Sequence, residues 1–452
     1  MTGTVEEYGA GAWCMSVPVP GSAPGEAQPT MTVRRSAAAL AAIATVLCAA
    51  AAPAAVAAPS PSPTPSTALP SGLYGTKDPT YDGVWRQSLA FLAQRVEGVV
   101  PATKSVDWLI AQQCANGAYA SYRADVSKPC DAKTMLDTNA TAAAVQALAE
   151  IGGHGDIVNN GVRWLKSIQN EDGGWGYNTG SPSDANSTSV VIGALARQGQ
   201  RIGDMTNPGG KTPYDALLAL AIPCGGPDGG AFAYQPDKAG KLAANADATA
   251  AAMLGSMGKG LAAGDNAAVG GTPPACRKGD VVKPEQAAQN GAFYLAGALA
   301  KNGNHLNLPP MPGADDTTPQ PDFGNTADAV VALASAGHKN KAAGAVGWLQ
   351  KNSRSWAAES GPAAYAQLVL AAHATGADAR DFGGVDLVRE LNASGPAPAA
   401  VITPSATPDD FSAEDGTSDD AGLGVWWLVG IGLAAGAGIG FLISSRRKTQ
   451  QP

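Results

Sequence analysis

One short polar phrase recurs through this chain and each time opens a helix that is rich in small residues. Each copy combines Asp or Asn with Thr, and alanines or other small residues follow it at helical spacing. The copies begin at Asp137, Asp184, Asn245 and Asp322. A period of roughly fifty residues is typical of architectures in which one helical unit recurs and packs on its neighbours. The chain therefore folds around repeated helix starts that carry equivalent polar side chains.

Residues 77–392 predict a single all-α domain, because apolar residues recur at helical spacing and alternating runs of Val, Ile and Thr are missing. The pattern predicts twelve helices, near residues 84–97, 102–113, 139–151, 157–169, 186–198, 213–222, 247–258, 284–301, 325–336, 339–351, 362–374 and 385–391. Helices of small residues alternate with helices that carry Trp108, Trp164 and Trp348. This alternation favours about six helical hairpins in two concentric rings, with the small-residue helices inside.

Both ends of the chain carry export and membrane signals. Residues 1–57 predict a leader and a signal peptide with its true start at Met31, because Arg34 and Arg35 precede an apolar run and a small-residue cleavage site. The twin arginines allow Tat export, but the sequence after them favours the Sec route. Residues 423–443 form an uncharged apolar stretch long enough to cross a bilayer, and basic residues follow it. We expect a cell-membrane protein with one span and an extracellular N-terminal domain.

The segments between these signals and the helical domain read as spacers. Residues 58–76 are rich in Pro and Ser, and residues 393–422 form an acidic stretch rich in Pro, Ala, Ser and Thr. Neither composition supplies enough apolar surface for a core. Residues 444–452 would form a short basic cytoplasmic tail. The net charge of −8 argues against nucleic acid and against an anionic bilayer surface as partners.

Four cysteines remain after removal of the signal peptide, and an even number in an exported chain indicates two disulfides. They are Cys114, Cys130, Cys224 and Cys276, and each falls between predicted helices. Three pairings are possible. Pairing of neighbours, Cys114 with Cys130 and Cys224 with Cys276, is the most economical.

A longer motif brings a specific resemblance. The segment from Gly161 to Trp175 reads GVRWLKSIQNEDGGW, and a second copy runs from Trp108 to Tyr119. Weaker copies start at Tyr294 and Trp348. The motif resembles the Gln-Trp repeat of squalene–hopene cyclases and related prenyltransferase-type α/α toroids. This resemblance implies that Gln and Trp fix the turn after an outer helix and that Gly permits the tight reversal.

The hallmarks of the enzymatic branches of that superfamily are missing. The chain has no Asp-x-Asp-Asp acid motif, no thioester motif and no zinc set of Asp, Cys and His. The four histidines are scattered, and His154 and His338 each follow an inner helix, where a capping role is favoured. We therefore assign no catalytic residue and no metal ligand, and the sequence favours a binding protein over an enzyme.

The phrases that open the inner helices resemble those of bacterial relatives of the transcobalamin and intrinsic-factor cobalamin carriers. That resemblance implies a non-catalytic toroid that requires no cofactor and holds cobalamin or a similar large polar ligand. The carriers close their ligand with a smaller β domain, which this chain lacks. A separate β-domain partner would then supply it, and a membrane uptake transporter would receive the ligand.

The repeated polar residues have two readings. Asp, Asn, Ser and Thr are preferred helix N-caps, so capping alone explains the Asp positions. Capping explains less well the Thr and Asn one step further in, where Ala is a better helix former. The candidate ligand contacts are Asp137, Asn139, Thr141, Asp184, Asn186, Thr188, Asn245, Asp247, Thr249, Asp322, Asn325, Thr326, Tyr177 and Tyr234.

The sequence therefore favours a membrane-anchored, extracytoplasmic protein that captures a corrinoid-like ligand for uptake. Two alternatives stay open. One is a toroid enzyme that processes isoprenoids or polysaccharides with one of the repeated Asp residues as general acid. The other is a surface scaffold for protein interactions. An apolar cavity with aromatics and one buried Asp of strongly raised pKa would favour the enzyme, and a filled centre would favour the scaffold.

Overall fold

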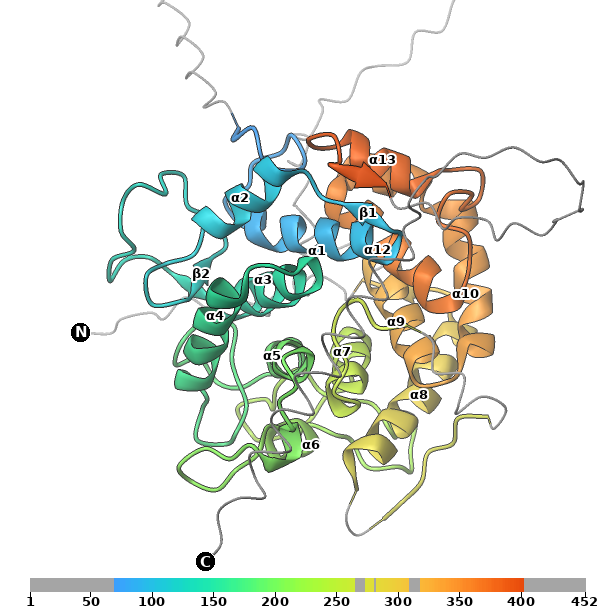
Figure 1. Ribbon diagram of the computed structural model, residues 1–452. Coiled ribbons are helices and arrows are strands. Elements are labelled where there is room, and N and C mark those ends of the chain that lie inside the picture. The colour runs from blue at the N-terminus through green and yellow to red at the C-terminus, as the bar shows by residue number, and fades with distance from the viewer. Residues whose placement is uncertain (1–68, 265–272, 280–281, 309–317, 402–452) are drawn as a thin grey trace, which may run out of the picture. The chain divides into compact units, whose positions relative to one another are not determined.

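Six helices of the chain pack side by side around a common centre (Figure 1). A computed structural model describes residues 69–264, 273–279, 282–308 and 318–401. The inner helices are α1 (Gly83–Val96), α3 (Thr138–Ile151), α5 (Ala185–Arg197), α7 (Ala246–Ser256), α9 (Phe323–Ser335) and α12 (Pro362–Thr375). Each contacts the next in this order, and α12 contacts α1, so the six close into a ring.

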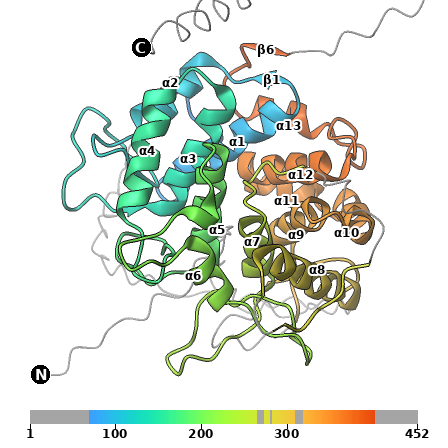
Figure 2. The ribbon, with the colours of Figure 1, turned by 60° about the horizontal axis from the view of Figure 1, so that its bottom comes forward.

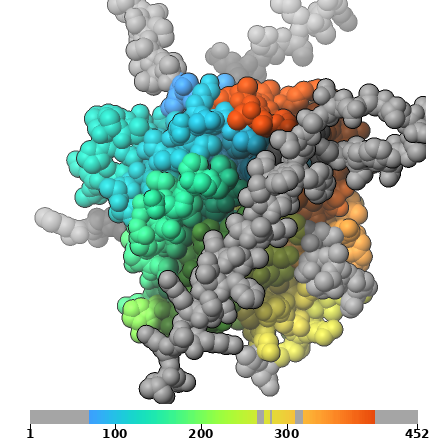
Figure 3. Space-filling view, viewed as in Figure 1, coloured from blue at the N-terminus to red at the C-terminus, as the bar shows by residue number. Residues whose placement is uncertain are grey.

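The remaining helices lie outside this ring, as the turned view in Figure 2 shows. They are α2 (Thr103–Ala111), α4 (Gly155–Ser167), α6 (Pro213–Ala219), α8 (Pro284–Lys301), α10 (Lys339–Asn352), α11 (Arg354–Ser360) and α13 (Leu387–Ala393), with a short 3-10 helix, η1 (Ile202–Asp204). In the space-filling view, successive segments occupy neighbouring sectors of the surface (Figure 3). The described part of the chain is thus mostly helical, with thirteen α-helices.

Three pairs of very short antiparallel strands connect parts of this frame. They are β1 (Val99–Val100) with β6 (Ala400–Val401), β2 (Tyr119–Ala120) with β3 (Leu136–Asp137), and β4 (Leu306–Asn307) with β5 (Pro321–Asp322). The β2–β3 and β4–β5 pairs end at the first residues of α3 and α9. They therefore fix where these inner helices begin.

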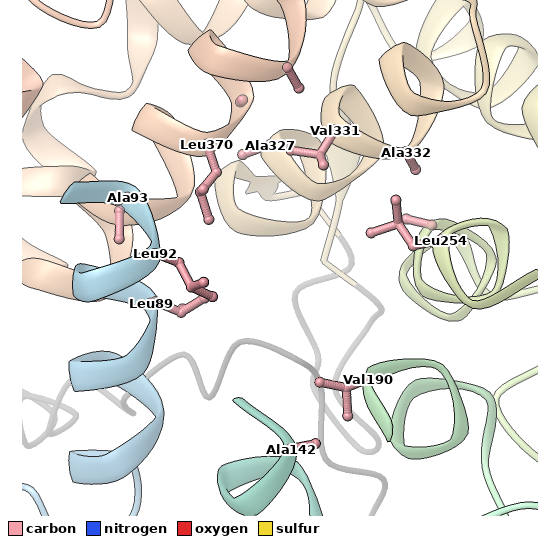
Figure 4. Packing of buried hydrophobic residues seen from close by; sticks show 14 of the residues in the cluster. Leu89, Leu92, Ala93, Ala142, Val190, Leu254, Ala327, Val331, Ala332 and Leu370 are labelled. Carbon is pink, nitrogen blue, oxygen red and sulfur yellow. The ribbon is translucent and has the colours of Figure 1, made fainter. Parts of the chain in front are cut away.

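Small side chains let the inner helices approach one another closely. Buried alanines follow each polar start, for example Ala142, Ala143 and Ala144 in α3, all without measurable exposure. The apolar side chains of Leu89, Leu92, Val190, Leu254, Val331 and Leu370 point toward the centre of the ring (Figure 4). The core of the protein is therefore the ring itself, with an apolar centre.

The Gln-Trp motif makes the contacts that its resemblance implied. Gln169 donates from Nε2 to the carbonyl of Gly173 at 2.7 Å, and Trp175 donates from Nε1 to the carbonyl of Leu165 at 2.7 Å. Gly173 has a φ of 94°, and a Cβ there would lie 2.2 Å from the carbonyl oxygen of Thr212. Only glycine fits this turn, because the conformation and the close contact both exclude a side chain.

All twelve predicted helices are present, with bounds that differ by a few residues. The sequence missed α11, because its seven residues follow α10 without a glycine or proline between them. The helical unit also extends beyond its predicted bounds. Tyr74, placed in the linker, is fully buried against Phe91, and Val401, placed in the stalk, pairs with Val99.

Both predicted disulfides form, Cys114–Cys130 and Cys224–Cys276. The described residues contain no helix that is long and apolar enough to cross a membrane. The predicted leader, signal peptide, membrane span and cytoplasmic tail, and most of the predicted stalk, lie outside the described residues.

Candidate functional site

The repeated Asp and Asn residues cap the inner helices. The side chain of Asp137 accepts a hydrogen bond from the Ala140 N–H at 2.8 Å, and Asp184 accepts one from the Ser187 N–H at 2.7 Å. Asn245 and Asp322 do the same at the starts of α7 and α9. Each bond satisfies a backbone donor that a helix start leaves unpaired.

The repeated threonines hold the connection before each inner helix. The hydroxyl of Thr249 accepts from the Phe232 N–H at 2.8 Å and donates to the Asn245 carbonyl at 2.6 Å. Thr141, Thr188 and Thr326 accept in the same way from the backbone of the preceding segment. All four are fully buried. The structure therefore places these predicted ligand contacts within the frame and away from open space.

The position two residues after each cap lies nearer the centre of the ring. It is occupied by Asn139 in α3, Asn186 in α5 and Asp247 in α7. Asn186 donates from Nδ2 to Oδ2 of Asp247 at 2.8 Å, so α5 and α7 are joined by a buried polar pair. The amide holds the Asp247 carboxyl in one orientation. Asn325, one residue further in on α9, instead donates to the Asp322 carboxylate at 2.7 Å.

A second carboxyl, Asp328, lies in the next turn of α9 and is half-buried. It does not line the cavity described below, but its hydrogen-bond partner Gln367 does. Burial, followed by the nearby charge of Asp247, raises the pKa of Asp328 well above its usual range. Gln367 of α12 donates from Nε2 to both Asp328 oxygens, at 3.1 and 3.3 Å.

The sequence did not single out Asp328. It stands six residues after the cap Asp322, in a helix otherwise made of small and apolar residues. At the matching position α5 has Val190 and α7 has Ala251. A carboxyl at a position where the other repeats carry apolar residues could have drawn attention to Asp328. It lies just after the repeated polar phrase and was therefore not among the predicted site residues.

Tyr177 and Tyr234 line the site, as the sequence predicted, and both contact cap residues. Tyr177 bonds to Asp137, and Tyr234 bonds to Asp184. Burial raises the pKa of both tyrosines, so they stay protonated and donate. Burial also raises the pKa of Asp184 to about 6, despite hydrogen bonds from Ser187 and Tyr234 that lower it. Burial likewise raises the pKa of Asp137 and Asp322.

These side chains border a cavity of about 2230 Å³ at the end of the ring where the inner helices start. Aromatic residues from separate segments surround it, namely Trp85, Tyr122, Tyr177, Tyr234, Phe323 and Trp356. Phe323 stacks on Trp356 with ring centroids 5.4 Å apart, and it also stacks on Trp348. The predicted residues Asp137, Asn139, Asp184, Asn186 and Asp322 line the cavity as well.

The opposite end of the ring is crossed by the segment after α7, residues 259–264. The Leu261 N–H donates to Oε1 of Gln146 in α3 at 2.8 Å, and Lys259 donates from Nζ to the Ser335 carbonyl of α9 at 2.8 Å. Ser335 in turn donates to the Gly264 carbonyl at 3.2 Å. This segment therefore links α3 and α9 across the end of the ring opposite the cavity.

Among the described residues, no group of three or more His, Cys, Asp or Glu side chains could hold a metal ion. The charged groups around the cavity are therefore carboxyls and a few basic residues at its edge. A set of enclosed carboxyls beside aromatic and apolar walls can donate and accept protons on a ligand with little competition from water.

Comparisons with known proteins find only distant similarity. No family model matches it. Over 110 residues it is 38% identical to a drimenyl diphosphate synthase of Streptomyces showdoensis, which covers 23% of this chain and 19% of that protein. Over 86 residues it is 36% identical to a drimenyl diphosphate synthase of Streptantibioticus cattleyicolor, covering 19% and 14%. The chain thus matches less than a fifth of the length of either relative.

Three solved structures share the general arrangement at low similarity. They are the type II terpene cyclase MstE from Scytonema (TM-score 0.39, 12% identity, 62% of this chain and 72% of that one), a protein from Actinoplanes (0.30, 18%, 64% and 99%), and a sugar epimerase from a ruminal bacterium (0.38, 16%, 62% and 80%). These scores carry no argument about function. Together the comparisons show distant similarity to terpene cyclases, and the cobalamin-carrier branch stays a prediction.

Proposed function

We propose that this protein is an enzyme that uses a protonated carboxyl to start a reaction on an isoprenoid held in the cavity, with Asp328 as the proton donor. The observation that supports the proposal is the contact of Asp328 with Gln367, a residue that lines the cavity, together with the nearby charge of Asp247. Burial, followed by the nearby charge of Asp247, raises the pKa of Asp328 and so favours its protonated form. This is the alternative for which the sequence set a test, namely a buried Asp of strongly raised pKa beside aromatic walls.

The chemistry follows from the groups that surround Asp328. A carbon–carbon double bond takes the proton from the Asp328 carboxyl, and its electron pair becomes the new C–H bond. The positive charge left on the neighbouring carbon is favoured by the Asp247 carboxylate and by the faces of nearby aromatic rings, such as Phe323 and Tyr234. Loss of a proton from an adjacent carbon ends the reaction, so isomerisation or cyclisation needs no oxidant.

The walls of the cavity favour an isoprenoid over a sugar. Besides the aromatic rings, the apolar side chains of Leu89, Met135, Leu308 and Ala363 line the cavity and offer no hydrogen bonds to hydroxyl groups. Burying a hydrocarbon chain against such a surface is favourable by about 25 cal/mol for each Å² removed from water. The local identity with drimenyl diphosphate synthases supports the same substrate class.

Corrinoid capture remains a second proposal, and the size of the cavity is the observation that favours it. Under this proposal Asn139 and Asn186 contact the ligand, and an uptake transporter and a separate β-domain protein act as partners. The scaffold alternative expected a filled centre, and the cavity favours the other two readings. For either ligand we propose an extracytoplasmic location, which the two disulfides support.

The decisive experiment incubates the purified full chain with prenyl alcohols and prenyl diphosphates of increasing length in deuterated water. We expect a product that carries one new C–D bond, seen by mass spectrometry. Asp328→Asn should lower its formation by at least about a hundredfold, because removing a general acid typically costs this much. Asp386→Asn is the matched control, since Asp386 caps α13 at a half-buried position that does not line the cavity.

Two results would remove the proposal. The first is an absence of product from every prenyl substrate with correctly folded protein. The second is full activity in Asp328→Asn, which would assign the proton to another group. A parallel titration with cobalamin tests the second proposal, and the absence of a spectral or calorimetric change at micromolar concentration would exclude corrinoid capture.

A further inference from the structure

One wall of the cavity is a single loop, residues 121–135, between β2 and β3. More of the side chains that line the cavity come from this loop than from any other stretch of the described chain, including Tyr122, Arg123, Lys133 and Met135. Met135 is 70% exposed and Val126 is 44% exposed, so the loop stands on the surface without a core of its own. Something other than apolar packing must hold it in place.

The first half of the loop is held by Arg123. Its guanidinium donates to the carbonyls of Ala111, Gln112 and Gln113, which are left unpaired where α2 ends. The Gln112 side chain accepts from the Arg123 N–H at 2.7 Å and donates to the Arg123 carbonyl at 3.2 Å. Tyr122 stacks on Trp108, with ring centroids 6.4 Å apart.

The second half of the loop, residues 129–135, has no such support. Within the described part of the chain its hydrogen bonds stay inside the loop, between Asp131, Lys133 and Thr134. Apart from the continuation of the chain into β3 at Leu136, its connection to the rest of the described protein is the disulfide from Cys130 to the buried Cys114. The bond therefore holds residues whose neighbours, Pro129, Asp131 and Met135, line the cavity.

We propose that the Cys114–Cys130 disulfide is a positioning element of the site: it holds the wall formed by residues 121–135 over the cavity, and its loss opens the wall and lowers ligand retention without unfolding the helical ring. The expected loss of ligand retention rests on the proposed function, whereas the expected opening of the wall does not. Without the bond, residues 129–135 regain chain entropy that corresponds to roughly a hundredfold lower population of the closed position.

The chain supplies its own matched control. Cys224–Cys276 closes a longer loop, with a sequence separation of 52 compared with 16, and neither the two cysteines nor their immediate neighbours line the cavity. A disulfide over the longer loop is expected to stabilise the fold at least as much. Cys224→Ser/Cys276→Ser should therefore lower the melting temperature while the wall and the affinity for a cavity ligand stay unchanged.

The test compares Cys114→Ser/Cys130→Ser with that control by hydrogen exchange of the full chain and by calorimetry with farnesol as the probe. We expect faster exchange in residues 124–135, unchanged exchange in the inner helices, and a Kd for farnesol raised at least about tenfold. If the double variant folds poorly, a thiol reductant added to folded Cys224→Ser/Cys276→Ser protein gives the same measurement, because one disulfide remains there.

The outcomes separate the two proposals. Unchanged exchange in residues 124–135 after loss of the bond overturns the role of the disulfide. Loss of exchange protection throughout the inner helices also overturns it, since the bond would then stabilise the fold and not the wall. Failure of the intact protein to bind any prenyl alcohol counts against the isoprenoid, and hydrogen exchange still decides the role of the disulfide.

Discussion

Replacing Asp184 with Asn should change how the stability of the protein depends on pH. Asp184 caps α5, has no measurable exposure, and accepts hydrogen bonds from the backbone and hydroxyl of Ser187 at 2.7 and 2.8 Å. Burial raises its pKa from an ordinary 3.8 to about 6. An amide keeps the capping oxygen and cannot ionise. It also replaces the oxygen that accepts from the Ser187 hydroxyl, but that change does not depend on pH, so the pH dependence of the difference reports the charge.

The sign and the magnitude follow from linkage. A group whose folded pKa is raised stabilises the folded state fully below the unfolded pKa, and this contribution is lost as pH rises through the folded pKa. The difference between about 6 and 3.8, at about 1.4 kcal/mol for each pH unit, amounts to about 3 kcal/mol. Most of this change lies between pH 4 and pH 7, so over that range the stability of Asp184→Asn relative to the natural protein should rise by between about 2 and 3 kcal/mol.

Thermal unfolding of both proteins across this pH range measures the effect. At about 2 °C for each kcal/mol in a domain of this size, the gap between their melting temperatures should change by about 5 °C. A gap between Asp184→Asn and the natural protein that stays constant with pH would refute the reasoning.

Two further substitutions distinguish residues that stabilise the helical ring from residues that act in the cavity. Thr249→Val leaves the buried Phe232 N–H without the hydroxyl that it contacts at 2.8 Å. The free energy of unfolding should therefore fall by about 1–3 kcal/mol, while the affinity for farnesol stays the same. A large loss of affinity at unchanged stability would indicate that Thr249 contacts the ligand. Gln367→Leu removes a hydrogen bond that lowers the pKa of Asp328, so the upper limb of the pH–rate profile should move to higher pH. A limb that moves to lower pH would contradict the assignment of Asp328 as the acid.

The sequence predicted the parts of this fold that local patterns encode. The twelve helices followed from helical periodicity, and the disulfides followed from the positions of the cysteines between those helices. The Asp and Asn caps followed from residue preferences at helix starts, and the structure shows their bonds, as at Asp137. The helices and their caps depend on residues that are close together in the sequence, and each disulfide depends on a single pair of cysteines.

The parts that the sequence missed depend on contacts between distant segments. Nothing local indicates that residues 259–264 cross the ring to reach Gln146, more than a hundred residues away. The repeated threonines looked like poor helix formers with a spare hydroxyl, and the hydroxyl is used by a backbone N–H from the preceding segment, as at Thr249. At these positions the sequence could not show that the hydroxyl already has a backbone partner.

The caps and the acid differ mainly in how many donors reach them. Asp137 and Asp184 lie at helix starts, where backbone N–H groups, a serine hydroxyl and a tyrosine each donate to the carboxyl and favour its charged form. The positive ends of the helix dipoles act in the same direction. Asp328 is one turn further along α9, beyond the free N–H groups, where Gln367 is the donor and Asp247 opposes ionisation. A carboxyl moved inward by one turn thus changes from a group that stabilises a helix start into one that keeps a proton, and this difference is why we assign the chemistry to Asp328.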